Sequence, residues 1–194
     1  MKKIWFAIVF SLLFSPAIAA SCEKIFDEDF STLKLMRVSS AKTNFLDANN
    51  QLQAAFVVKN DLVITSSQMD SLTCAYFFTK KGTYTAGYLK TANLQKNTVV
   101  QKLAGFWRDD AGDNKISVQA NLSFQADLGF RSGTVLTFGQ LKGRFIRLGS
   151  HWRYKRGECE VKSLVVGNVL LVSGGSTGCD FAINIQVEGI YTRS

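Results

Sequence analysis

Residues 163–172 read SLVVGNVLLV. Two runs of branched aliphatic residues flank the dipeptide Gly167-Asn168, and a two-residue turn of this composition between such runs is a strong signal for a β-hairpin. The stretch therefore predicts two adjacent antiparallel strands joined by a tight turn.

Alternating sequence lies on both sides of this hairpin. Lys115–Phe124 places apolar residues at every second position, and Cys179–Glu188 repeats the pattern with Cys179, Phe181 and Ile183 among its inward-facing residues. A period of two predicts strands with one buried face and one solvated face. Further strand candidates are Thr134–Phe138, Gly143–Leu148 and Trp152–Cys159. We expect residues 104–194 to form an antiparallel β-barrel or sandwich domain of roughly six or more strands.

The first half of the chain has a different character. All 15 glycines lie at or after Gly82, and the one proline is Pro16. Ala54–Thr65 contains two β-branched runs interrupted by Lys59-Asn60-Asp61, which predicts strands around a tight turn. Two more short strands are predicted on either side of the next turn, at Leu72–Phe78 and Thr83–Leu89. Upstream of them, Phe26, Phe30 and Leu33 have helix-like spacing, which predicts a short N-terminal helix.

The order of these pieces resembles the bacterial SH3-like domains, in which apolar strands around a charged turn precede a cysteine–aromatic strand and a glycine–aromatic strand. The matching residues are Phe56–Ile64, Thr73–Tyr76, Gly87–Leu89 and Ala92–Leu94. Asn60 replaces the family's usual glycine, and Tyr88 its usual tryptophan. The resemblance implies an SH3-like small barrel within residues 20–97 and a ligand groove around Tyr76 and Tyr88.

The second half resembles the β domain that follows SH3-like domains in some uncharacterised secreted bacterial proteins. The features in common are Cys159-Glu160-Val161, the apolar run Leu170–Val172, a glycine-rich loop with Cys179, and the ending Gly189–Arg193. The resemblance implies an architecture and leaves the chemistry open. We expect the boundary between the two halves to lie between Asn97 and Gly105, because the SH3-like match ends just before it and the long alternating stretch begins soon after it.

Residues 1–19 have the features of a signal peptide. Lys2 and Lys3 precede an apolar run, Ile4–Phe14, and the small residues of Ala17–Ala19 suit cleavage by a signal peptidase. The run is too short to span a bilayer. We therefore expect a periplasmic or secreted protein. An alternative takes residues 19–22 as a lipidation site, which would anchor the protein through a lipid on Cys22.

Four cysteines in an exported chain predict two disulfides. They are Cys22, Cys74, Cys159 and Cys179. Three pairings are possible, and we favour Cys22–Cys74 with Cys159–Cys179, because each bond then closes a loop within one half of the chain.

The charge of the chain is positive and evenly spread. Loss of Lys2 and Lys3 with the signal peptide lowers the formal net charge from +8 to +6. Residues 20–103 hold 10 basic and 7 acidic residues, and residues 104–194 hold 11 and 8. A nucleic-acid-binding protein usually concentrates its positive charge on one element. The composition therefore favours weak contact with anionic polymers of the envelope over nucleic-acid binding.

The sequence matches known catalytic motifs only in part. Residues 174–178 match the G-x-S-x-G pattern of α/β-hydrolases, but a strand pattern follows Ser176 instead of a helix, and the single histidine, His151, precedes it. The acidic run Asp109–Asn114 lacks the spacing of an EF-hand. We expect no metal site, no cofactor and no enzymatic activity, although carboxylate pairs drawn from distant strands stay open as an alternative.

One segment, residues 142–156, combines basic and aromatic residues without any acid. Its cations are Lys142, Arg144, Arg147, Arg153, Lys155 and Arg156, and its aromatic residues are Phe145, Trp152 and Tyr154. In a strand, Trp152, Tyr154 and Arg156 share one face, while Arg153 and Lys155 share the other. Such a surface binds carboxylates, phosphates or sugars. The alternative is a solvated strand pair whose aromatic rings fill the core.

These features predict an exported, non-enzymatic binding protein. The first hypothesis is contact with peptidoglycan, another anionic envelope polymer or a peptide through the SH3-like domain. The second hypothesis is a periplasmic inhibitor or immunity protein that blocks a cell-wall hydrolase or secreted toxin. Neither hypothesis involves nucleic acid or a membrane-spanning segment.

Overall fold

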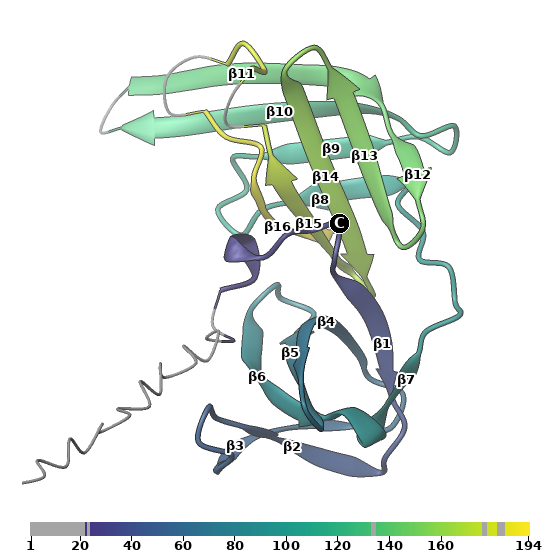
Figure 1. Cartoon of the computed structure of the whole chain (residues 1–194). Coiled ribbons are helices and arrows are strands. Elements are labelled where there is room, and N and C mark those ends of the chain that lie inside the picture. The colour runs from purple at the N-terminus through teal and green to yellow at the C-terminus, as the bar shows by residue number, and fades with distance from the viewer. Residues whose placement is uncertain (1–21, 23, 133–134, 176–177, 182–184) are drawn as a thin grey trace, which may run out of the picture.

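The protein is all-β and contains two antiparallel sheets, one of them nearly closed into a barrel (Figure 1). The computed structural model describes residues 22, 24–132, 135–175, 178–181 and 185–194. The expected fold class is confirmed. The proposed signal peptide, Ser176 and Ile183 lie outside the described residues.

The first sheet, sheet A, is built from residues 34–96 in the order β3-β2-β6-β5-β4-β1-β7. Its strands are β1 (Lys34–Val38), β2 (Lys42–Leu46), β3 (Leu52–Val58), β4 (Leu62–Met69), β5 (Leu72–Phe78), β6 (Tyr84–Lys90) and β7 (Leu94–Lys96), with a 3-10 turn η2 (Thr91–Asn93) before β7. The tight turn after β3 is present, with Asn60 at φ 76°. The strands that it joins do not pair with each other, because β3 pairs with β2 while β4 pairs with β1 and β5.

The second sheet, sheet B, is built from residues 105–193 in the order β11-β10-β9-β8-β16-β15-β14-β13-β12. Its strands are β8 (Gly105–Arg108), β9 (Lys115–Val118), β10 (Ser123–Ser132), β11 (Val135–Arg144), β12 (Ile146–Leu148), β13 (His151–Arg156), β14 (Cys159–Val166), β15 (Val169–Gly174) and β16 (Gly189–Arg193).

The SLVVGNVLLV stretch forms the β14–β15 hairpin, and Gly167 in its turn has φ 60°. Its strands are apolar at nearly every position because both of their faces are buried. Val165, Leu170 and Val172 face the core of sheet B. Leu164, Val166, Val169 and Leu171 face a second core, which they share with sheet A and the N-terminal segment. The hairpin therefore joins the two halves of the molecule.

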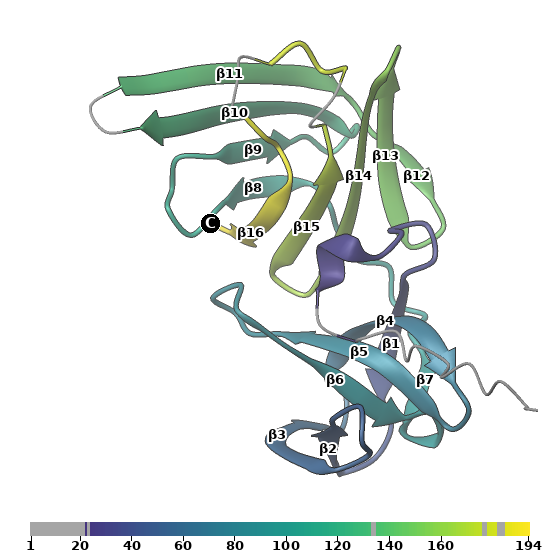
Figure 2. The same cartoon turned by 60° about the vertical axis from the view of Figure 1, so that its left-hand side comes forward.

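The N-terminal segment lies between the two sheets (Figure 2). In place of the expected short helix it contains one 3-10 turn, η1 (Ile25–Asp27), and then a second turn, in which Thr32 N–H donates to Asp29 O at 2.9 Å. Ile25 and Phe30 are buried in the shared core. The apolar residues with helix-like spacing are thus buried by tertiary packing, and the backbone does not continue as a helix beyond η1.

The expected long strand over Lys115–Phe124 is wrong. The chain turns after Val118, and β9 pairs with β10 as a hairpin. Gln119 N–H donates to Ser123 O at 2.8 Å, Leu122 takes φ 67°, and Asn121 Oδ1 accepts from Ser123 N–H at 3.0 Å. The short side chain of Asn121 stabilises a turn inside a sequence that alternates throughout.

The expected strand over Cys179–Glu188 is also absent from the described part of that range. Ile185 and Val187 are buried and Gln186 and Glu188 are exposed, as the alternation predicts, but no ladder forms there. Side chains supply the contacts instead, because Glu188 Oε2 accepts from Gly174 N–H at 3.1 Å. Strand pairing resumes only at β16.

Both favoured disulfides are present. Cys22 pairs with Cys74, and Cys159 pairs with Cys179. Because Cys22 Sγ is bonded to Cys74, the same sulfur cannot also carry a lipid thioether, which argues against the lipid-anchored alternative.

We expect the two sheets to unfold in a single transition because they share a core. Leu171 is fully buried in that core, and Leu171→Ala is expected to destabilise the protein by about 2–5 kcal/mol. Tryptophan fluorescence follows sheet B, where Trp107 and Trp152 lie, and near-ultraviolet circular dichroism also follows the tyrosines of sheet A. Leu171→Ala should lower the urea midpoint of both signals by the same amount. Two separate transitions, with only one shifted, would contradict a shared core.

Candidate functional site

The aromatic residues of the basic segment are core residues. Trp152 and Tyr154 are 3% and 6% exposed. The ring of Tyr154 packs edge-on against Phe124, at 5.2 Å between centroids, and covers Gly143. Neither ring presents a broad surface for stacking, and their burial supports the packing alternative.

The cations of this segment point in several directions. Arg153 and Lys155 lie on the face opposite Trp152, and Arg153 forms an ion pair with Glu160 at 2.9 Å. Arg144 Nε donates to Asn121 O at 3.1 Å. Lys142, Tyr154 and Arg156 line a small depression of about 310 Å³ beside the Cys159–Cys179 disulfide. The segment therefore does not form one continuous basic patch.

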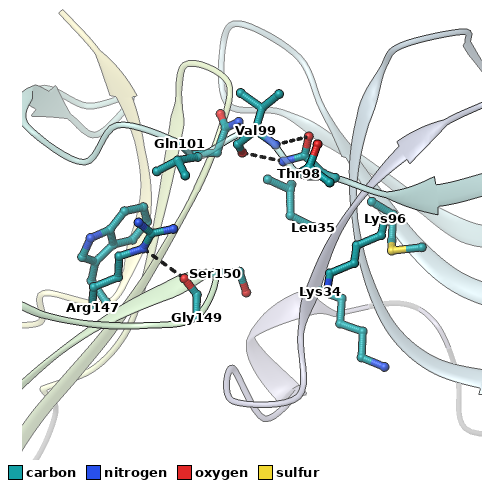
Figure 3. A pocket seen from close by; sticks show the side chains of 13 residues that line it. Lys34, Leu35, Lys96, Thr98, Val99, Gln101, Arg147, Gly149 and Ser150 are labelled. Carbon is teal, nitrogen blue, oxygen red and sulfur yellow. Dashed lines mark hydrogen bonds between the residues drawn. The ribbon is translucent and has the colours of Figure 1, made fainter.

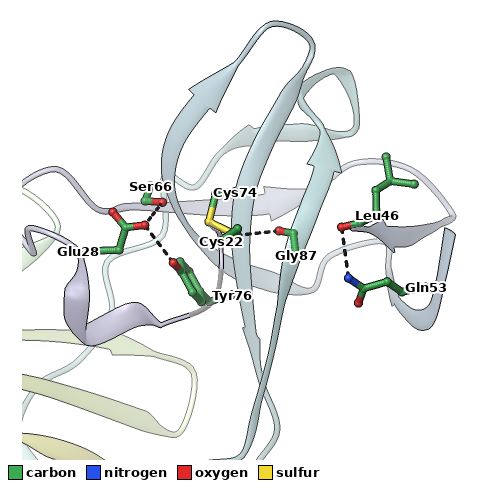
Figure 4. The surroundings of a disulfide bond; sticks show 8 residues. All are labelled: Cys22, Glu28, Leu46, Gln53, Ser66, Cys74, Tyr76 and Gly87. Carbon is green, nitrogen blue, oxygen red and sulfur yellow. Dashed lines mark hydrogen bonds between the residues drawn. A yellow bond between two sulfur atoms is a disulfide. The ribbon is translucent and has the colours of Figure 1, made fainter. Parts of the chain in front are cut away.

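Tyr76 and Tyr88, the residues of the implied SH3-like groove, are both buried. Tyr76 O–H donates to Glu28 Oε1 at 3.0 Å, and Ser66 O–H donates to the same oxygen at 2.8 Å (Figure 4). Burial, followed by the charge of Glu28, raises the pKa of the Tyr76 phenol. The N-terminal segment therefore covers Tyr76, and the ring is not accessible to a ligand.

A larger cleft, of about 550 Å³, lies where the two sheets meet. One wall comes from β1 and the end of β7, the opposite wall from the β12–β13 hairpin, and the connection between the sheets completes it (Figure 3). The lining residues are Lys34, Leu35, Met36, Lys96, Asn97, Thr98, Val99, Val100, Gln101, Arg147, Gly149, Ser150 and Trp152.

Charge in this inter-sheet cleft is of one sign. Lys34 and Lys96 lie on one side and Arg147 on the other, and the lining contains no acidic residue. Arg147 Nε donates to Gly149 O at 3.1 Å. Within the described parts of the chain, no carboxylate forms an ion pair with any of the three cations. The lining also includes exposed apolar side chains, because Val99 and Val100 are 56% and 61% exposed.

Side-chain hydrogen bonds fix the connection, residues 97–104, in place. Asn97 Oδ1 accepts from Arg37 at 3.1 Å, and Gln101 Oε1 accepts from Gly167 N–H at 3.3 Å. Arg193 donates to Ala104 O at 2.8 Å and to Lys102 O at 2.6 Å. The exposed valines are thus presented on a segment that is held at several points, which lowers the entropic cost of binding.

Two of the predicted site residues, Arg147 and Trp152, line this cleft. Sequence reasoning missed Lys34, Lys96 and the two valines. Lysines at strand ends are common on any protein surface, so no sequence pattern distinguishes these two as binding residues. The one available signal was the apolar pair Val99-Val100 within the boundary between the two halves.

The described residues contain no cluster of three or more potential metal ligands. In the acidic run, Asp109 accepts hydrogen bonds from the backbone and side chain of Asn114, at 3.2 and 2.8 Å. That geometry closes the β8–β9 turn. No protein-family model matches the chain, and no curated protein or solved structure matches it either.

Proposed function

We propose that this is an exported, non-enzymatic binding protein of the cell envelope, and that the inter-sheet cleft takes a carboxylate-bearing segment of peptidoglycan or of an envelope peptide. The observation that carries the proposal is a cleft lining that contains three cations, Lys34, Lys96 and Arg147, together with exposed apolar side chains and no acidic residue. A ligand with carboxylates and small apolar groups complements such a surface.

Size and compartment support the same proposal. A volume of about 550 Å³ lies within the usual range for ligand sites. Two disulfides suit an oxidising compartment. Across the described residues, no helix has the length and hydrophobicity required to cross a membrane. The SH3-like character of sheet A, which would relate the protein to modules that bind the cell wall, is part of the proposal.

Reversing the charge of the cleft is the direct test. The double variant Lys96→Glu with Arg147→Glu should bind purified sacculi about 10- to 100-fold more weakly than the wild type, because favourable charge pairs become repulsive. The matched control is Lys155→Glu, which changes an exposed lysine of β13 outside the cleft lining. Cosedimentation with sacculi measures binding, and raising the salt concentration should weaken wild-type binding in the same direction.

Failure of the wild type to bind sacculi, together with capture of a hydrolase or toxin from periplasmic extract, would favour the inhibitor hypothesis. Equal loss of binding in the Lys155→Glu control would indicate that the binding site lies on the outer face of β13. The basic segment of residues 142–156, in which Arg153 and Lys155 share one face, would then be the better candidate.

A further inference from the structure

A second depression, of about 470 Å³, lies on the outer face of sheet B, the face opposite its core. Its residues come from β8, β9, β10, β11 and the turn between β9 and β10, and these four strands run side by side at one end of the sheet (Figure 1). The lining residues are Phe106, Ser117, Gln119, Ser123, Phe124, Gln125, Asp127 and Lys142. This outer depression is separate from the inter-sheet cleft, because the two linings share no residue.

Strand register places one residue from each of the four strands in a single row across the outer depression. Phe106 of β8 pairs with Ser117 of β9. Gln125 of β10 pairs with Ser117 on one side and with Lys142 of β11 on the other. Paired residues of an antiparallel sheet project from the same face. Ser117 has the shortest side chain of the four, so the row is hollow at that position.

Hydrogen bonds orient the polar groups of this row before any ligand binds. Gln125 Nε2 donates to the two carboxylate oxygens of Asp127, at 3.0 and 3.1 Å. Gln140 Nε2, from the facing position of β11, donates to Asp127 Oδ1 at 2.7 Å. Among the described residues, neither Gln125 Oε1 nor Ser117 Oγ has a hydrogen-bond partner, so both can bond a ligand. Groups that are already oriented bind at a lower entropic cost.

Phe106 presents an open aromatic ring at one end of the row. The residue is 67% exposed, although β8 lies inside the sheet, between β9 and β16. Its neighbours on the two sides are both serines, because it pairs with Ser117 and its carbonyl oxygen accepts from Ser194 N–H at 3.0 Å. Serine side chains are too short to cover the ring. An aromatic face is therefore available beside the oriented polar groups.

The charges of the lining balance, because it contains one carboxylate, Asp127, and one ammonium group, Lys142. The outer depression thus differs from the cleft, whose charges are all positive, and it suits a ligand without net charge. Sugar hydroxyl groups both donate and accept hydrogen bonds, and the C–H face of a sugar ring packs on an aromatic ring. We infer that the outer depression is a site for a neutral saccharide, which packs on Phe106 and bonds to Ser117 and Gln125 through its hydroxyl groups.

Titration of the exported, disulfide-bonded protein with a tetramer of N-acetylglucosamine and a tetramer of glucose, each to about 10 mM, tests the inference by amide NMR shifts. At least one should bind with a Kd of about 1 mM or lower and shift Ser117 and Gln125. Phe106→Ala should weaken binding about 10-fold or more, as loss of an aromatic anchor does. Gln125→Ala should weaken it about 5- to 10-fold through one lost hydrogen bond. The matched control is Phe56→Ala on β3 of sheet A, where the ring is 49% exposed; it should leave the Kd unchanged.

A wild type that binds neither tetramer at about 10 mM would overturn the inference. So would an equal Kd for the wild type and for folded Phe106→Ala and Gln125→Ala, with near-ultraviolet circular dichroism as the test of folding. The cleft variant Lys96→Glu with Arg147→Glu should bind the tetramers as the wild type does, because neither residue lines the outer depression. Loss of saccharide binding in that variant would place the sugar in the cleft and contradict the inference. The two sites can thus fail or succeed separately.

Discussion

Replacing Cys22 and Cys74 together by serine is expected to lower the free energy of unfolding by about 4 kcal/mol. The two residues are 52 positions apart, and the loop-entropy model gives a larger stabilisation for a longer closed loop. Urea unfolding of the wild type and the double variant measures the difference.

Loss of this disulfide should also uncover Tyr76. Cys22 is the anchor of the N-terminal segment, and its Sγ lies 3.2 Å from the carbonyl oxygen of Gly87 (Figure 4). This is a van der Waals contact, because a disulfide sulfur carries no proton to donate. Once the segment loosens, Glu28 leaves Tyr76 and the raised pKa of that phenol should fall toward its ordinary value. A spectrophotometric titration of the tyrosines, with Tyr76→Phe as reference, detects the change.

The second disulfide supplies the matched control. Cys159 and Cys179 are 20 positions apart, and their replacement by serine should cost about 3 kcal/mol. It should leave the titration of Tyr76 unaltered, because Cys159 begins β14 and Cys179 packs against the core of sheet B. An equal change in the Tyr76 titration for both pairs would show that the N-terminal segment is held by general stability and not by Cys22.

Elements defined by local signals were predicted from the sequence. The turn at Gly167 and the strands on both sides of Gly82 follow from composition over a few residues, and the structure contains them. The favoured disulfide pairing was also correct, because each half of the chain has its own sheet. Errors arose where tertiary contacts compete with periodicity. Residues 115–124 alternate through a turn, and Glu188 accepts from Gly174 N–H through its side chain in place of a backbone ladder.

The cleft could not be predicted for a geometric reason. Its cations come from three places that are far apart in sequence, and only the packing of sheet A against sheet B brings Lys34 and Lys96 near Arg147. That packing depends on the β14–β15 hairpin, which has two apolar faces. The two apolar runs of the hairpin are evident in the sequence. That both faces of this strand pair are buried, each in a different core, could be learned only from the fold.

Trp107 connects the stability of sheet B to the shape of the cleft. The side chain is fully buried, and its Nε1–H donates to Leu103 O at 2.9 Å. The guanidinium carbon of Arg193 lies 4.1 Å from the ring centroid, and Arg193 bonds the carbonyl groups of Lys102 and Ala104. One indole ring thus supports the end of the connection that lines the cleft.

Trp107→Ala is expected to destabilise the protein by about 3–5 kcal/mol, the usual cost of deleting a large aromatic side chain from a core. Trp107→Phe is the matched variant, because it retains much of the packing and removes the hydrogen bond to Leu103 O. It should cost less in stability and still weaken binding to sacculi, since the connection loses a fixed point beside the cleft. Urea unfolding, with Trp152 as the remaining fluorescent probe, measures stability, and cosedimentation at a temperature where Trp107→Phe is folded measures binding. Wild-type affinity in a folded Trp107→Phe would mean that the hydrogen bond to Leu103 O is not needed to hold the connection, and Arg193→Gln would then be expected to produce the loss of binding instead.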